Sequence, residues 1–185
     1  GEEGLTLGIC TEMYCPFFLW LLNTCMKITS FHVEASTHCN ARCPGCPRNI
    51  SGYNVKDYFT LQHLSPERYK EIVDAYPSLS YVRINGGLGD PMMNPAIVKI
   101  VETSNCLVQI TTNGSIGNRK TFERLAELKT DIEFSIDGLA DTNHLYRQDV
   151  QWDKIMERVK WFVGAGGRAT WKWVPFRHNK HQLDE

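Results

Sequence analysis

Three cysteines with a short, regular spacing are the residues of this chain best suited to metal chemistry. Cys39, Cys43 and Cys46 are separated by three and by two residues. Thiolates are the ligands of iron–sulfur clusters, and one short loop can bring three of them to the same cluster. Three protein ligands on a four-iron cluster leave one iron open, and that iron can bind a small molecule through nitrogen and oxygen atoms.

Two other interpretations of the cysteine triplet stay open at this point. A structural zinc site takes four ligands, commonly in two pairs, and the sequence has no second close pair of Cys or His. His38 could be a fourth ligand, but its position next to Cys39 strains the geometry. Unligated thiols are the remaining alternative. The spacing favours an iron–sulfur cluster over both.

The elements that must position these cysteines follow from alternating apolar patterns. Short apolar runs predict strands at 31–35, 81–84, 107–110, 132–136 and 169–176. Helical patterns separate them, and the first begins at Ser65-Pro66, where Ser is a good N-cap and Pro fits the first turn. Further helices are predicted from Asn94-Pro95, around Phe122 and over 152–163. This order predicts an α/β fold with a parallel sheet and helices outside it.

Polar and glycine residues follow every predicted strand. Because the carboxyl ends of parallel strands meet at one edge of the sheet, these residues should gather there beside the cysteines. That convergence is stronger evidence for a site than any single motif. The residues concerned are Gly87, Gly89, Asp90, Asn113, Ser135, Asp137, Arg147, His178 and Asn179.

The cysteine spacing just after a first strand resembles the signature of the radical S-adenosylmethionine (SAM) superfamily. Four further segments resemble the layout of that superfamily over about residues 28–182, and the form Cys-Pro-x-Cys-Pro-Arg is most similar to its SPASM/twitch members. One departure is Gly45, since the residue before the third cysteine is usually aromatic and packs near the adenine. The four segments are Gly87-Leu88-Gly89-Asp90-Pro91, Thr112-Asn113-Gly114, Phe134-Ser135-Ile136-Asp137-Gly138 and Tyr146-Arg147.

The resemblance implies SAM contacts for each segment. Backbone groups of the glycine-rich turn would bind the SAM amino group, Ser135 would face the ribose or carboxylate, and Arg147 would pair with the carboxylate. The alternatives are a tight turn, internal hydrogen bonds and a surface arginine, respectively. The cofactor-binding residues predicted in this way are Gly87, Gly89, Asp90, Asn113, Ser135, Asp137 and Arg147, with Cys39, Cys43 and Cys46 as metal ligands.

The resemblance also implies an activity. A 4Fe-4S cluster would reductively cleave SAM to a 5′-deoxyadenosyl radical for hydrogen abstraction, with a reductant such as flavodoxin or ferredoxin as partner. We expect a peptide or protein as substrate. The alternatives are modification of a nucleoside or small metabolite by the same chemistry, and a non-catalytic iron–sulfur or zinc-binding module.

Composition narrows the protein class. The chain has 185 residues, a formal net charge of −1 and 42% hydrophobic residues, which indicates a globular domain without a clear nucleic-acid surface. The apolar run 17–22 is too short to span a bilayer. Residues 1–26 contain no Lys or Arg, which argues against a signal peptide. We therefore predict a cytoplasmic protein whose seven cysteines are reduced or metal-bound.

The two ends of the chain carry the last expectations. Residues 1–25 show no sustained periodicity, and we expect them to be an extension that is not native, with Met26 as the natural start; an ordinary N-terminal arm is the alternative. Residues 26–185 are expected to form the radical SAM core. Members of the superfamily usually have a six-stranded partial TIM-like barrel, whereas only five strands are predicted here, so the barrel is expected to be truncated after the fifth strand.

Overall fold

Five parallel strands form the central sheet of the computed structural model, which describes residues 27–50, 54–55 and 60–183. Their spatial order is β1-β4-β5-β6-β7, so each strand of this sheet lies beside the next one in the chain. The predicted extension, residues 1–25, lies outside the described residues. The strands are β1 (Ser30–Glu34), β4 (Tyr81–Asn85), β5 (Leu107–Thr112), β6 (Asp131–Ser135) and β7 (Arg168–Lys172).

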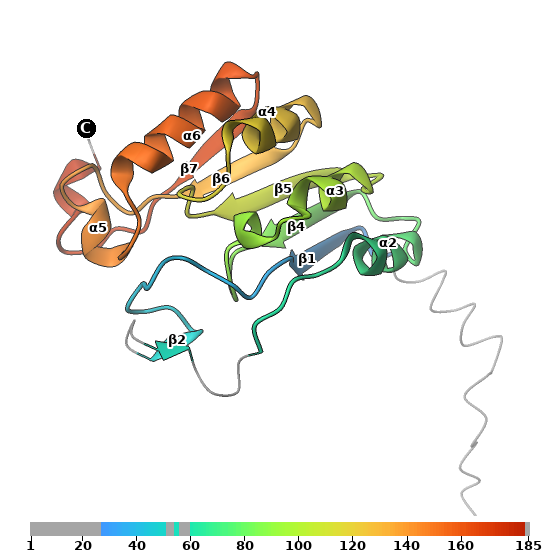
Figure 1. The fold of residues 1–185 in the computed structure, drawn as a ribbon, viewed down its shortest axis with the longest axis horizontal. Helices are drawn as coiled ribbons and strands as arrows, with labels where there is room; N and C mark the ends of the chain where they lie inside the picture. The colour runs from blue at the N-terminus through green and yellow to red at the C-terminus, as the bar shows by residue number, and fades with distance from the viewer. Residues whose placement is uncertain (1–26, 51–53, 56–59, 184–185) are drawn as a thin grey trace, which may run out of the picture.

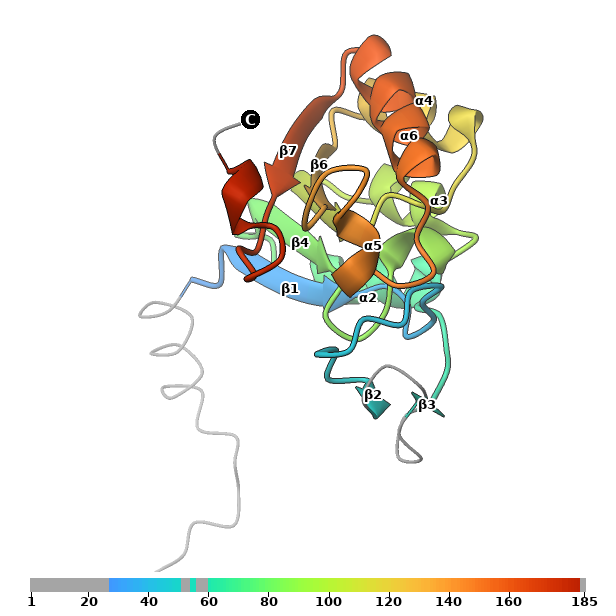
Figure 2. The ribbon, with the colours of Figure 1, turned by 90° about the vertical axis from the view of Figure 1, so that its left-hand side faces the viewer.

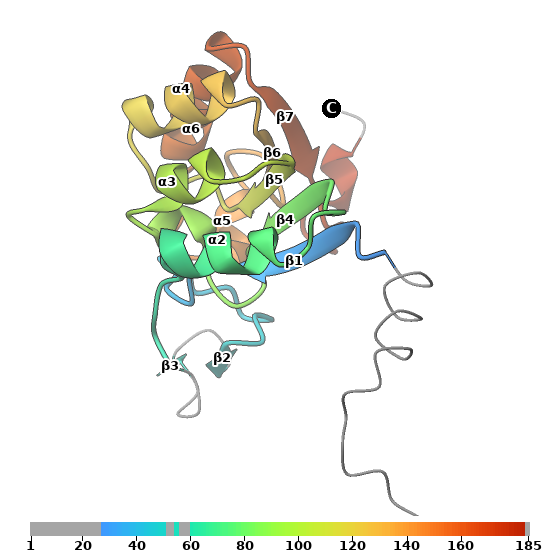
Figure 3. The same ribbon diagram turned by 90° about the vertical axis from the view of Figure 1, so that its right-hand side faces the viewer.

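Helices follow the strands in alternation and gather on one face of the sheet (Figures 1 and 3). The sheet curls between β1 and β7, so that its opposite face is concave (Figure 2). This arrangement confirms the predicted α/β fold with a parallel, partly closed barrel. The helices are α2 (Pro66–Asp74), α3 (Ile97–Glu102), α4 (Arg119–Glu127), α5 (Asn143–Tyr146) and α6 (Trp152–Gly164), with short 3-10 turns η1 (Pro91–Met93) and η2 (Lys180–Gln182).

Helix α2 begins where the sequence predicts. Ser65 is its N-cap, and the Ser65 hydroxyl accepts a hydrogen bond from the Arg68 amide at 3.1 Å. Tyr69 and Val73 are buried on the predicted apolar face, while Tyr76 lies beyond the helix and is exposed. Capping by Ser and a Pro at the first position therefore set the start of this helix.

Two predicted elements differ from the structure at their ends. The chain after β4 turns through η1, capped by the Asp90 carboxylate on the Met92 amide, and α3 begins only at Ile97. Strand β7 ends at Lys172 instead of continuing to residue 176. The amide of Val174 donates to the Asp137 carboxylate at 2.8 Å, and Pro175 has no N–H to give, so neither residue extends the sheet.

Most of the hydrophobic core lies between the sheet and its helices, and a few of its members, such as Ala41 and Cys43, lie on the cysteine loop. Alternate residues of the strands point to this convex side, and Ile84, Ile110, Ile132 and Phe134 are at most 1% exposed there. Phe122 of α4 and Phe162 of α6 pack against Phe134, each with ring centroids 6.3 Å from it. Burial on this side fixes the register of the sheet, because a slip of one residue would turn the apolar set away from the helices.

The concave face is polar across its whole width. The residues that alternate with the core set pair in rows from strand to strand, and most of them are half-buried or exposed. One row crosses all five strands, and a second runs one step nearer the carboxyl ends. The first is His32, Arg83, Gln109, Asp131 and Arg168, and the second includes Glu34, Asn85, Thr111, Glu133 and Thr170.

The segment between β1 and α2 holds the cysteines and a small antiparallel pair, β2 (Asn49–Ile50) with β3 (Asn54–Val55). This pair lies beside the carboxyl ends of the strands, away from the helix layer (Figure 2). No helix among the described residues has the length and apolarity needed to cross a bilayer.

Candidate SAM and iron–sulfur site

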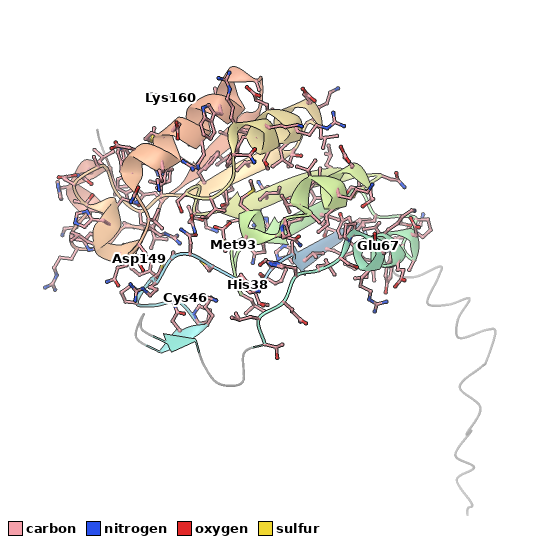
Figure 4. The ribbon with its side chains drawn as sticks, viewed as in Figure 1. His38, Cys46, Glu67, Met93, Asp149 and Lys160 are labelled. Atoms are coloured by element: carbon pink, nitrogen blue, oxygen red, sulfur yellow. The ribbon has the colours of Figure 1, made fainter. Side chains whose placement is uncertain are left out.

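The three cysteines lie on the loop that follows β1, and all three side chains line one cavity of about 220 Å³ at the carboxyl ends of the strands. Cys43 is buried, Cys39 and Cys46 are half-buried, and none of the three is in a disulfide. The Cys46 amide donates to the Cys43 carbonyl at 3.1 Å, which closes a tight turn between them. Figure 4 shows Cys46 and His38 at this end, whereas Glu67 and Lys160 lie on the outer helices.

The environment of Cys39 and Cys43 favours the protonated thiol over the thiolate. Burial, together with the nearby Asp90 charge, raises the pKa of Cys39 to about 11. Burial also raises the pKa of Cys43, although the Arg147 guanidinium opposes that rise. Because only the thiolate binds metal, loading of this site must release protons.

The residues present fit a cluster of several irons better than one metal ion. Among the described residues, no three His, Cys, Asp or Glu side chains converge as ligands of a single ion. The three cysteines instead line one shared cavity, which suits a cluster in which each thiolate binds a different iron. Two N–H donors also lie near the sulfurs, since Asn113 Nδ2 is 3.9 Å from Cys39 Sγ and an Arg147 nitrogen is 3.9 Å from Cys43 Sγ.

The glycine-rich turn after β4 packs directly against the cysteine loop. A Cβ atom on Gly89 would lie 2.2 Å from the Ser36 carbonyl oxygen, so only glycine permits this approach of two backbones. The Glu34 carboxylate accepts hydrogen bonds from the amides of Gly87 and Leu88, at 3.2 and 3.0 Å. Two amides of the turn are therefore already paired, and Gly89 serves the packing of the two loops as well as the cavity that it lines.

Asp90 organises the floor of the cavity from a buried position. Its carboxylate accepts hydrogen bonds from the Thr112 hydroxyl at 2.8 Å, the Asn113 amide at 2.8 Å and the Met92 amide at 2.9 Å. Its own amide donates to the His38 carbonyl at 2.8 Å. Burial raises the pKa of Asp90, and the hydrogen bonds it accepts act in the opposite direction. Asp90 thus joins the ends of β4 and β5 to the cysteine loop.

Asn113 has a second set of contacts at the end of β5. Its Nδ2 donates to Asn40 Oδ1 at 3.0 Å, and its Oδ1 accepts from the amide and the hydroxyl of Ser115. Asn113 is 5% exposed, so its side chain is held in one orientation beside Cys39.

Asp137 and Arg147 form the best-buried ion pair among the described residues. Arg147 Nε lies 2.6 Å from Asp137 Oδ2, and the Asp137 side chain is fully buried. Ser135 ends β6 and lines the cavity, but Asp137 lies beyond the strand and does not. Residues two apart in a strand share one face of the sheet, but β6 ends at Ser135, so this rule does not extend to Asp137. Asp137 therefore meets the cavity through Arg147, and its direct contact with SAM stays a prediction.

The turn after β7 also differs from the prediction. Asn179 is fully buried, and its Nδ2 donates to the carbonyls of Asp137 and Val174 at 2.8 and 3.0 Å. Its Oδ1 accepts from the Phe176 amide at 2.6 Å. These bonds use the whole side chain to build a turn, so Asn179 is a structural residue and neither Asn179 nor His178 lines the cavity.

The family model for the radical SAM superfamily matches residues 33–174. This range includes the end of β1 and the whole of β4, β5, β6 and β7. The chain belongs to the radical SAM superfamily. This confirms the resemblance seen in the cysteine spacing and in the turns. Among curated proteins, none matches the sequence.

Solved structures of radical SAM enzymes share the fold. The chain matches anSMEcpe with bound S-adenosylmethionine at a TM-score of 0.64 and 19% identity, covering 78% of this chain and 44% of that one. It matches SuiB of Streptococcus suis bound to precursor peptide SuiA at 0.69 and 20%, covering 86% and 36%. The cobalamin-dependent radical enzyme OxsB matches at 0.57 and 13%, covering 83% and 26%. The chain thus spans less than half the length of each of these proteins.

The cavity is also lined by residues that were not among the predicted cofactor or metal ligands. Thr111 and Thr112 line the cavity from the end of β5, Arg48 lines it from the cysteine loop, and Tyr146 lines it from α5. The threonines directly precede Asn113 at a strand end, and that position was the available signal. Tyr146 is part of the Tyr-Arg motif, but nothing in the sequence shows that its ring reaches the cysteines.

Proposed function

We propose that this chain carries the SAM-cleaving site of a radical enzyme, with Cys39, Cys43 and Cys46 holding a 4Fe-4S cluster and SAM lying in the adjoining cavity. One observation carries the proposal. Every residue predicted for the cluster and the cofactor lines the same cavity, with the single exception of Asp137. These residues come from the ends of four strands and from α5, so their meeting is a property of the fold and not of one motif.

When bound and reduced, the cluster supplies the electron that splits SAM into methionine and a 5′-deoxyadenosyl radical, and that radical removes a hydrogen atom from the substrate. The protein orients the reactants. Arg147, fixed by Asp137, presents a cation beside Cys43 that suits a carboxylate as partner. Glu34 occupies the amides of Gly87 and Leu88, which leaves the carbonyls of that turn as acceptors for an amino group.

The proposed substrate is a peptide or protein, and the proposed subtype is SPASM/twitch. The form Cys-Pro-Gly-Cys-Pro-Arg supports the subtype. The fold shared with SuiB, whose structure holds a precursor peptide, supports the substrate class. The broad polar concave face offers room and hydrogen-bonding groups for such a chain. Electrons would come from a small reductant such as flavodoxin or ferredoxin.

An anaerobic assay tests the proposal. The protein is reconstituted with iron and sulfide, reduced with dithionite and mixed with SAM, and 5′-deoxyadenosine is measured by liquid chromatography with mass spectrometry. We expect visible cluster absorbance and formation of 5′-deoxyadenosine. Cys39→Ala, Cys43→Ala and Cys46→Ala should each lose both.

Cys106→Ala is the matched control. Cys106 is half-buried and lies outside the cavity, among Leu79, Asn105 and other residues at the opposite end of the sheet. This variant should keep the cluster absorbance and the product. Stoichiometric zinc with no cluster after reconstitution would contradict the proposal.

A further inference from the structure

Tyr146 occupies the space beside the cysteine loop that a side chain at position 45 would otherwise fill. Gly45 directly precedes Cys46 and has no side chain. A Cβ atom placed on Gly45 would lie 3.0 Å from the Tyr146 hydroxyl oxygen and 3.7 Å from its Cε2 atom. The edge of the phenol ring therefore lies directly against this glycine, although the two residues are far apart in the sequence.

Tyr146 is also the single aromatic side chain among the described residues that line the cavity. The rest of the lining consists of cysteines, glycines, threonines and other small or polar residues, with two arginines. A purine base gains most of its affinity from stacking on a flat ring, and one such contact is worth about 1–3 kcal/mol. Within this cavity, no other described side chain offers that surface for the adenine of SAM.

The turn after β7 packs against the Tyr146 ring. Phe176 packs on Tyr146 with ring centroids 4.4 Å apart, and His178 stacks on Phe176 at 5.3 Å. Asn179 holds that turn in place through its bond from the Phe176 amide. The next residue after the tyrosine, Arg147, is fixed by Asp137. Phe176 and the Arg147 guanidinium, whose central carbon lies 5.6 Å from the ring centroid, therefore hold the Tyr146 ring in place.

We infer that Tyr146 is the residue on which the adenine of SAM stacks in this protein, that Gly45 is small because Tyr146 takes its place, and that Phe176 positions the tyrosine ring. The inference rests on the proposed function, because it concerns the same cofactor. It goes further in assigning base recognition to Tyr146 of α5, with support from Phe176 of the turn after β7.

Binding measurements test the inference without relying on turnover. Dissociation constants for SAM, 5′-deoxyadenosine and methionine are measured by equilibrium dialysis on the reconstituted full chain. Tyr146→Leu removes the ring and should raise the constants for SAM and 5′-deoxyadenosine about tenfold, which corresponds to about 1.4 kcal/mol. Tyr146→Phe keeps the ring and should stay within about twofold of the parent chain. Binding of methionine and the cluster absorbance should not change.

Tyr76→Leu is the matched control, because Tyr76 is 39% exposed and packs on Phe31 at the other end of the sheet. It should leave all three constants unchanged. If Tyr146→Leu leaves the constant for 5′-deoxyadenosine unchanged while the parent chain binds it, the inference is overturned and the proposed function stands. If the parent chain forms no cluster and binds no SAM, the proposed function itself fails.

An exchange of the two positions gives an independent test. Gly45→Phe alone should weaken SAM binding, since the new ring collides with Tyr146. The double variant Gly45→Phe with Tyr146→Ala removes the collision and returns a ring to the cavity, so it should bind 5′-deoxyadenosine more tightly than Tyr146→Ala alone. A double variant that binds no better than Tyr146→Ala would overturn the equivalence of the two positions.

Discussion

Gly89 shows how the absence of a side chain can hold the cysteine loop in place. Its α-carbon lies where the turn after β4 meets the backbone of the cysteine loop, and the Asp90 amide next to it donates to the His38 carbonyl at 2.8 Å. Any Cβ here would meet the backbone of Ser36, which cannot move aside as a flexible side chain can. The position of the cysteines therefore depends on a residue that binds no metal.

Gly89→Ala should for this reason reduce the cluster content of the reconstituted protein while leaving the cysteines in place. The measurement is iron and sulfide per chain together with visible absorbance. The new Cβ atom would clash with the Ser36 carbonyl oxygen. Only a shift of the turn after β4 relative to the cysteine loop can remove this clash.

Gly164→Ala is the matched control, because no atom lies within 4 Å of the added Cβ and the residue ends α6. It should keep full cluster content and gain up to about 1 kcal/mol of stability from the better helix propensity of alanine. Equal cluster content in the two variants would show that the contact with Ser36 is not limiting.

The sequence predicts which residues lie near the site. It does not predict which of them face the cavity and which form hydrogen bonds within the protein. Cys39, Arg147 and Ser135 reach the cavity as the motifs imply. Asp90, Asp137 and Asn179 look like ligands because they are polar and follow strands, yet each uses its side chain on backbone or side-chain partners inside the protein. Whether a buried polar group meets a cofactor or the protein depends on neighbours distant in the sequence.

At the scale of elements, the short segment between β4 and α3 fastens several parts of the fold. Asn94 follows η1, is 1% exposed, and its Nδ2 donates to the carbonyls of Ala35 and Leu64 at 2.7 and 2.9 Å. Its Oδ1 accepts from the Ala96 amide at 2.9 Å. One side chain therefore joins the end of β1, the approach to α2 and the start of α3.

Asn94→Ala should lower the free energy of unfolding by about 1–3 kcal/mol, because the Leu64 carbonyl loses its side-chain donor and the Ala35 carbonyl keeps only the Leu64 amide. Urea denaturation followed by circular dichroism measures this loss. Asn105→Ala, at an exposed position between α3 and β5, should change the free energy of unfolding by less than about 0.5 kcal/mol. A comparable loss in both variants would rule out a specific role for the Asn94 contacts.

The elements themselves were predicted to within a few residues where periodicity and capping act together. Strand β4 and helix α2 begin where the apolar pattern and Ser65 indicate. The misplaced ends, at α3 and β7, are set by Asp90 and Asp137, whose carboxylates capture backbone amides that a regular helix or strand would otherwise use. Local propensity has no information about such tertiary competition.

At the scale of the whole molecule, stability comes from one layer of contacts between the sheet and its helices. Phe134 sits in the middle of that layer at 1% exposure and packs against rings from both α4 and α6. Its neighbours are large and rigid, so they cannot close over a hole left by a smaller side chain.

Phe134→Ala should therefore cost about 3–5 kcal/mol in the free energy of unfolding, close to the total stability of many domains. Thermal and urea unfolding measure the loss. Leu107→Ala removes a side chain that is 65% exposed and should be nearly neutral. A small loss at Phe134 would mean that the two helices can repack without the central ring.

The polar rows of the concave face can accept amino-acid substitutions more easily than the packed convex side. Because most of the core lies on the convex side, residues such as His32, Gln109 and Thr170 contribute little to holding the fold together. Evolution can therefore alter their size and charge with little risk of unfolding the chain. Separating this polar face from the packed face that maintains the fold leaves one side of the sheet free to change while the other stays constant.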